Sequence, residues 1–191
     1  MKATGMSDRP RRVSVRAALL SALLLCAGCT LPGGIPLPSG APAGSDTPAG
    51  SASTAAVARD VIAEVNRTRR SNQLNPLIED AALNRAAREH SEELAARRTL
   101  DHNSTNPARR TMTMRIEAAG GTWSRAAENL LNMSGQAADV PSQTVRMWLS
   151  SEGHRRNMLS PDYTHTGVGV AIDQRGIWYV TQLYVFPRPV R

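Results

Sequence analysis

Cysteine and lysine are almost absent from this 191-residue chain, and both absences narrow what the protein can do. No cysteine follows Cys29, so the rest of the chain can form neither a disulfide nor a thiolate metal site. The one lysine is Lys2, and the arginines are spread in ones and twos in a chain with only 4% aromatic residues. Nucleic-acid binding favours a concentrated basic face with stacking aromatics, so we expect no nucleic-acid partner.

Familiar hydrolase signatures are missing as well. The sequence contains no H-E-x-x-H zinc motif and no nucleophile elbow, and it places no serine or cysteine beside a base. These absences argue against a protease or esterase of the common types. They leave open a site built from residues far apart in the sequence.

The N-terminus has the layout of a secretory signal over residues 1–28. A basic stretch precedes the apolar run "AALLSALLLCAGC", which is about a dozen residues long and too short to span a bilayer stably. "CAGC" resembles the bacterial lipobox, with Cys29 as the lipidation site, although Cys26 stands where leucine is commonest. We therefore predict an exported protein held to the cell-envelope membrane by a lipid anchor. Cleavage without lipid, which gives a secreted protein, is the alternative.

Removing the signal changes the charge balance. Residues 1–28 carry five basic residues and one acidic residue, so 18 basic and 15 acidic residues remain and the formal charge falls from +7 to +3. Residues 29–54 are rich in proline, glycine and serine with a single charge, which is typical of a flexible tether. We expect the folded domain at residues 55–191, which is long enough for a proper core.

Hydrophobic periodicity predicts helices on a small antiparallel sheet, an α+β sandwich. In the second helical run, the inward stripe comprises Leu83, Ala86 or Ala87, His90 and Leu94. Gly120 and Gly121 end the third run. "DQRG" predicts a hairpin turn between two strand-like runs, and a short strand near Trp123 supplies a third partner. The predicted helices fall near residues 55–73, 79–99, 107–119 and 138–151, and the strands near 164–173 and 177–186.

The four histidines differ in their surroundings: His90, His102, His154 and His165. His90 falls on an inward helix face, where a hydrogen-bonded core residue is more common than a ligand. His165 opens a strand, and a surface position is the default. His102 follows a helix end, where a loop can present an imidazole to a cleft. Glu128 lies in the apolar run "AENLL", and a carboxylate there requires a partner.

Five motifs together resemble the bacterial branch of the CAP superfamily, the SCP-like or allergen V5-like domains. In chain order they are "LNRAAREHSEELAARRTLDH", "AENLL", "WLSSEGHRRNML", "YTHTGVGVA" and "WYVTQLYVF", and the resemblance covers residues 57–186. It implies a three-layer α-β-α sandwich around a cleft. His102, Glu128 and His154 match the family's cleft residues. The second cleft glutamate of eukaryotic members corresponds to Ser151, with Glu152 beside it.

Two imidazoles and a carboxylate are suitable zinc ligands with a position left open for water or substrate. Without metal, His102, Glu128 and His154 can instead satisfy one another by hydrogen bonds. The favoured hypothesis is a monomeric surface binding module for a lipid, peptide or cell-wall ligand. The alternative is a metal-dependent hydrolase or protease using the same cleft. A purely structural envelope protein is a third possibility.

Overall fold

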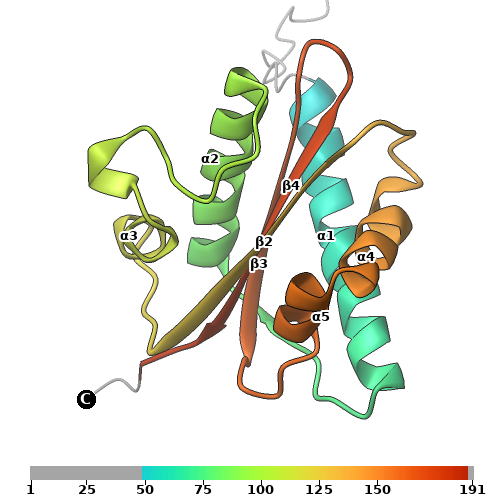
Figure 1. The fold of residues 1–191 in the computed structure, drawn as a ribbon, viewed down its shortest axis with the longest axis vertical. Helices are drawn as coiled ribbons and strands as arrows, with labels where there is room; N and C mark the ends of the chain where they lie inside the picture. Colours follow the sequence, from blue (N-terminus) through green and yellow to red (C-terminus); the bar gives the residue numbers. More distant parts are fainter. Residues whose placement is uncertain (1–48, 189–191) are drawn as a thin grey trace, which may run out of the picture. The chain divides into compact units, whose positions relative to one another are not determined.

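The computed structural model describes residues 49–188, which form helices on both faces of one sheet (Figure 1). The predicted signal peptide, Cys29 and most of the predicted tether lie outside the described residues. The first helix is α1 (Ala49–Ser71), and it begins before the domain start expected at Ala55. The other helices are α2 (Ala81–Arg97), the short 3-10 helix η1 (Pro107–Arg109), α3 (Met112–Ala118), α4 (Val140–Ser150) and α5 (Glu152–Met158).

The sheet has four strands in the order β1-β3-β4-β2. The predicted hairpin is β3 (His165–Ile172) with β4 (Trp178–Phe186), and its turn is closed by a 2.9 Å bond from Gly176 N to Asp173 O. Strand β2 (Arg125–Met133) pairs antiparallel with β4. The two-residue strand β1 (Ile78–Glu79) pairs parallel with β3, so the sheet is mixed, with an antiparallel core.

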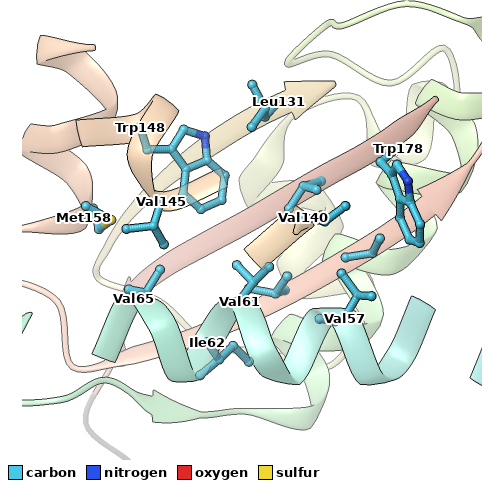
Figure 2. Close-up of a cluster of buried hydrophobic side chains, with 14 of the residues drawn as sticks. Val57, Val61, Ile62, Val65, Leu131, Val140, Val145, Trp148, Met158 and Trp178 are labelled. Carbon is cyan, nitrogen blue, oxygen red and sulfur yellow. The ribbon is translucent and has the colours of Figure 1, made fainter. Parts of the chain in front are cut away.

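The three layers predicted from the family resemblance are confirmed. Helices α2 and α3 lie on one face of the sheet, and α1, α4 and α5 lie on the other (Figure 1). The larger core cluster joins α1 to α4 and α5 through Val61, Val65, Trp148 and Met158 (Figure 2). Trp148 is fully buried, whereas its neighbour Met147 is 42% exposed.

Two glycines of β3, Gly167 and Gly169, let α2 lie directly on the sheet. A Cβ atom at Gly167 would lie 2.2 Å from the carbonyl carbon of Leu83, and one at Gly169 would lie 2.1 Å from that of Ala87. Only glycine permits so close an approach of strand and helix backbones. The consequence is a fixed position for α2 and for the loop that follows it.

Two predicted elements differ from the structure, and one helix is absent from the prediction. The third helix is divided into η1 and α3, each with its own N-cap. Asn106 caps η1, and Thr111 caps α3 by accepting a hydrogen bond from Met114 N on its Oγ1 at 3.3 Å. The strand expected near Trp123 begins at Arg125 and is nine residues long. Helix α5 was missed, because Ser151 in an extended conformation separates it from α4 and its sequence is too short to show a period.

Candidate functional site

The candidate site lies at the outer strand β2, where Glu128 and Asn129 point to opposite faces of the sheet. Successive side chains of a strand alternate between faces. Glu128 therefore meets the α2 and α3 layer, and Asn129 meets α5. Asn129 Nδ2 donates to His154 O at 3.0 Å and to the Tyr184 hydroxyl at 3.2 Å. This pair of neighbours ties both helical layers to the strand.

Glu128 is held by two partners, one on each carboxylate oxygen. His102 Nδ1 lies 2.8 Å from Oε1, and Arg115 Nη2 donates to Oε2 at 2.5 Å. The Glu128 and Arg115 side chains are each 3% exposed, whereas that of His102 is 63% exposed. The hydrogen bond to Glu128 raises the pKa of His102 above its ordinary value of 6.5. Partial burial of the ring lowers this pKa but does not outweigh the hydrogen bond. The imidazole is thus held at Nδ1, while most of the side chain stays exposed.

Arg115 also fastens the loop that carries His102. Its Nη1 donates to His102 O at 3.0 Å and to Arg110 O at 3.2 Å. Arg115 lies on the buried face of α3 beside the fully buried Ile116. The helix therefore delivers a guanidinium to the buried side of Glu128, and that guanidinium holds the backbone of His102 as well.

His90 supports the same loop from α2. It is buried, and its Nε2 lies 3.0 Å from Asp101 O, which can only accept, so Nε2 carries the proton. Burial lowers the pKa of His90, and the positive charge of Arg115 lowers it further. The prediction that His90 is a hydrogen-bonded core residue is confirmed. His90 and Arg115 together hold the carbonyls of residues 101 and 102.

A third group fixes the far end of this loop. Glu93 of α2 accepts from Ser104 Oγ at 2.5 Å and from Thr105 N and Oγ1 at 2.8 and 2.9 Å. Burial opposes ionisation of this carboxyl, but these hydrogen bonds outweigh it and lower the pKa of Glu93 to about 2. The loop from Asp101 to Thr105 is therefore bound to α2 at both ends.

His154 approaches the site from α5 without joining its hydrogen bonds. Partial burial lowers the pKa of His154, and the nearby charge of His102 lowers it further. Within residues 49–188, the His154 ring makes no hydrogen bond to Glu128 or to His102. Its position is set through its carbonyl by Asn129, whose Oδ1 accepts from Asn157 Nδ2 at 2.9 Å.

A cavity of about 320 Å³ opens beside His102. Its walls come from the His102 loop, the start of α3 and β2. Thr111 and Thr113 offer hydroxyl groups, which lie 3.1 Å apart, and Met112 supplies the apolar surface. The lining residues are His102, Asn103, Thr111, Met112, Thr113 and Glu128. Five of these six residues carry a hydrogen-bonding group, although apolar atoms make up most of the exposed lining.

The zinc ligand set suggested by the sequence, His102, Glu128 and His154, does not come together as a metal site. In the described part of the chain, no three His, Cys, Asp or Glu side chains are placed to hold one ion. In addition, both oxygens of Glu128 already accept a hydrogen bond, one of them from the permanent cation Arg115. Two imidazoles alone fall short of the three protein ligands usual for catalytic zinc. Glu152 supplies no replacement, because it is exposed and lies 3.8 Å from Arg156.

Sequence reasoning missed Arg115, although a signal for it existed. Met112, Arg115, Ile116 and Ala119 share one face of a helix by their spacing. A charged residue on an inward face needs a partner of opposite sign, and Glu128 was already identified as a buried carboxylate that needs one. The prediction that Glu128 has a partner is thus met by both His102 and Arg115.

Comparison with known proteins agrees with this architecture. The chain is 31% identical over 133 residues to the Bacillus subtilis (strain 168) protein YkwD. The aligned region covers 70% of this chain and 48% of YkwD. It is 34% identical over 96 residues to the membrane protein YlbC of the same organism, covering 50% of this chain and 25% of YlbC. The chain therefore spans about half, or less, of the length of these relatives.

Solved structures share the fold. An extracellular protein containing a SCP domain from Bacillus anthracis str. Ames matches with a TM-score of 0.60 and 25% identity, over 69% of this chain and 41% of that one. An outer surface protein of Borrelia burgdorferi matches with a TM-score of 0.61 and 21% identity, over 71% and 96% of the two chains.

The family model for CAP, the cysteine-rich secretory protein family, matches residues 62–184. No cysteine lies in that range, so the fold forms here without disulfides. No helix within residues 49–188 is long and apolar enough to cross a membrane. From the matched range, the three-layer fold and the relatives, we conclude that this chain belongs to the CAP family.

Proposed function

We propose that this protein is an exported binding module that holds a polar cell-wall fragment in the cavity beside His102. The observation that carries the proposal is the contrast between His102 and its support. The imidazole is 63% exposed at a cavity of about 320 Å³, while Glu128 and Arg115 beneath it are 3% exposed. A hydrogen-bonding group held rigidly at the mouth of a cavity is a typical feature of a ligand site.

The chemistry of the cavity favours one of the three ligand types expected from the sequence. An imidazole, an amide and two hydroxyls line it, with Met112 as the main apolar side chain. A fatty acyl chain would leave these polar groups without partners, which costs free energy. The amide and hydroxyl groups of a peptidoglycan fragment can satisfy them. We therefore place a cell-wall ligand ahead of a lipid.

Export is part of the proposal. It rests on the signal-like residues 1–28 and on relatives described as an extracellular protein and an outer surface protein. Lipidation at Cys29 would keep the domain at a membrane, within reach of the wall. Metabolic labelling with a radioactive fatty acid tests this step, since Cys29→Ala should abolish the label.

The alternative of a metal-dependent hydrolase has less support. It needs a carboxylate or imidazole set free to hold an ion, and Glu128 is paired with Arg115. The proposal therefore assigns His102 a binding role. A digest of a peptide library by the purified protein should yield no cleavage, and cleavage that Glu128→Ala removes would support the alternative instead.

Co-sedimentation with purified peptidoglycan tests the binding function. The wild-type protein should sediment with the sacculi, and His102→Ala should lower the bound fraction about tenfold, the effect of roughly 1.4 kcal/mol from one lost hydrogen bond to a fixed group. Arg70→Ala is the matched control, because Arg70 is exposed on α1, on the other face of the sheet from His102.

Two results would contradict the proposal. One is equal sedimentation of the wild type and His102→Ala. The other is binding to phospholipid vesicles of mixed anionic composition that exceeds binding to sacculi and is lost in His102→Ala. That result would support a lipid as the ligand. Circular dichroism of each variant should confirm that it is folded before its binding is compared.

A further inference from the structure

We propose that Arg115 takes the place of a metal ion at this site, so that its guanidinium is the built-in cation that makes the His102–Glu128 pair independent of zinc. This inference concerns how the site is charged, and it holds whether or not the cavity binds a cell-wall fragment. It arises from the disagreement between a residue set that suits zinc and a structure that does not assemble it.

The first step is the state of the carboxylate. Glu128 accepts one hydrogen bond on each oxygen, at 2.8 Å from His102 and at 2.5 Å from Arg115. A zinc ion would need one of these oxygens at about 2.0–2.2 Å. Each oxygen keeps a second lone pair, so these hydrogen bonds alone do not exclude the ion, but it would lie beside the imidazole or the guanidinium.

The second step is the permanence of the Arg115 charge. A guanidinium is not deprotonated in proteins, and this one is 3% exposed, so water screens it poorly. A divalent ion on Glu128 would lie next to a fixed positive charge. Repulsion between the two cations opposes metal binding at this carboxylate.

The third step is that Arg115 cannot easily move away. Besides Glu128, it donates to the carbonyls of His102 and Arg110, at 3.0 and 3.2 Å. Displacing it would break these bonds and release the loop that carries His102. The chain thus places a cation on Glu128 and uses the same group to position the imidazole. Arg115 acts through Glu128 and His102, which makes it a positioning residue.

The fourth step is what the site would become without this cation. A neutral residue at 115 would leave Oε2 of the buried Glu128 carboxylate with no counter-ion, next to the imidazole of His102. A carboxylate oxygen and an imidazole nitrogen are both zinc donors. Removing Arg115 should therefore raise the affinity of the His102–Glu128 pair for zinc above that of the natural chain.

Zinc binding by matched variants tests the inference. Wild type and Arg115→Lys keep a cation at position 115, and Arg115→Gln does not. A single charge within about 4–6 Å changes an ionisation equilibrium by one to three powers of ten, so we expect zinc to bind Arg115→Gln about tenfold or more tightly than wild type. The readouts are isothermal titration with zinc chloride and the shift in melting temperature with zinc or with a chelator.

Arg115→Lys should respond as the wild type does, because it keeps the positive charge although it cannot reproduce all the hydrogen bonds of the guanidinium. A purely structural role for Arg115 would destabilise both variants and give neither any zinc response. If Arg115→Gln does not fold alone, refolding with zinc present should recover it, and a failure of zinc to do so overturns the inference. Zinc binding by the wild type that Glu128→Gln abolishes would overturn it too.

These outcomes are separate from those of the binding function. Sedimentation with peptidoglycan can succeed or fail without changing the zinc response of Arg115→Gln. Loss of sedimentation in His102→Ala, conversely, says nothing about metal.

Discussion

Arg115 and Glu128 form a buried ion pair that joins α3 to β2, with Nη2 and Oε2 2.5 Å apart and each side chain 3% exposed. The pair holds His102 in two ways. Glu128 accepts a hydrogen bond from the imidazole, and Arg115 donates one to the backbone carbonyl of the same residue. Breaking a buried pair leaves an uncompensated charge, which is far more costly than losing a pair in water.

Arg115→Met should therefore lower the free energy of unfolding by about 3–5 kcal/mol. The double variant Arg115→Met with Glu128→Leu should recover much of this loss, because no charge is then left buried. Urea denaturation of the two single variants and the double variant measures the coupling. Arg88→Ala is the comparison, because the exposed pair of Arg88 with Glu92 should contribute only about 0.3–0.5 kcal/mol. Equal losses for Arg115→Met and Arg88→Ala would contradict the role of burial.

The imidazole of His102 should titrate above 6.5, and that of His154 below it, in NMR spectra recorded against pH. The hydrogen bond to Glu128 stabilises the protonated form of His102, so Glu128→Gln should lower its pKa. Glu92→Gln, which removes an exposed carboxylate of α2, is the control and should leave it unchanged. An unchanged pKa of His102 in Glu128→Gln would show that the His102–Glu128 hydrogen bond is absent in solution.

The sign of the stability effect follows from the direction of the His102 shift. A pKa raised on folding means that the protonated His102 stabilises the fold below the unfolded value of 6.5, and this contribution disappears as the pH rises through the folded pKa. His90 acts in the opposite direction, because burial lowers its pKa and folding is favoured while it stays neutral. The free energy of unfolding of His102→Ala and His90→Gln, measured on both sides of pH 6.5, should separate the two contributions. His102→Ala should lose stability mainly at the acidic end, and His90→Gln should remove the loss of stability that protonation of His90 causes there.

Gly169→Ala should destabilise the fold by about 1–3 kcal/mol or more, because its new methyl group would lie 2.1 Å from the carbonyl carbon of Ala87 and must push α2 off the sheet. Gly153→Ala is the matched control. Gly153 is helical and nothing lies within 4 Å of its added Cβ, so helix propensity should stabilise that variant by up to about 1 kcal/mol. Thermal unfolding of both variants measures the contrast. Equal melting temperatures would show that α2 does not lie this close to β3.

Arg69→Lys should destabilise the protein by about 1–3 kcal/mol, although it keeps the charge. The buried guanidinium of Arg69 donates to Met158 O at 2.7 Å, Ser160 O at 2.9 Å and Asn75 O at 2.9 Å, a fork that an ammonium group cannot reproduce. Hydrogen exchange should accelerate in residues 158–164 of the variant. Arg70→Lys, at the exposed neighbouring position, should change neither quantity.

The elements that could be predicted from sequence are those with a long period or a distinct turn. Val57, Val61 and Val65 recur at helical spacing, and their burial on α1 is confirmed. The hairpin of β3 and β4 follows from two β-branched runs around "DQRG". Helix α5 and strand β1 escaped prediction because seven and two residues are too few to show a period, and their conformation depends on neighbours such as Asn129 and Thr166.

The site was predictable in part. Position in the family motifs pointed to His102 and Glu128, which form a hydrogen bond, and to His154, which comes near without one. His102, Glu128 and His154 are not placed to share one ion, and the sequence did not reveal that Arg115 pairs with Glu128. Whether a buried carboxylate meets a metal or an arginine depends on which side chain of α3 faces β2, and no spacing within "AENLL" contains that information.

Reading along the chain was sufficient for the family, the lack of cysteine beyond Cys29, the helical and strand periods, and the glycines that let α2 meet the sheet. Those properties are local or compositional, so each is visible without coordinates. The partners of Glu128 were set by folding. The pair with Arg115 joins residues 13 positions apart, and α5 is tied to β2 across 25 positions, from His154 to Asn129. Electrostatic pairing acts through space, and only the folded chain determines which charges lie within hydrogen-bond distance.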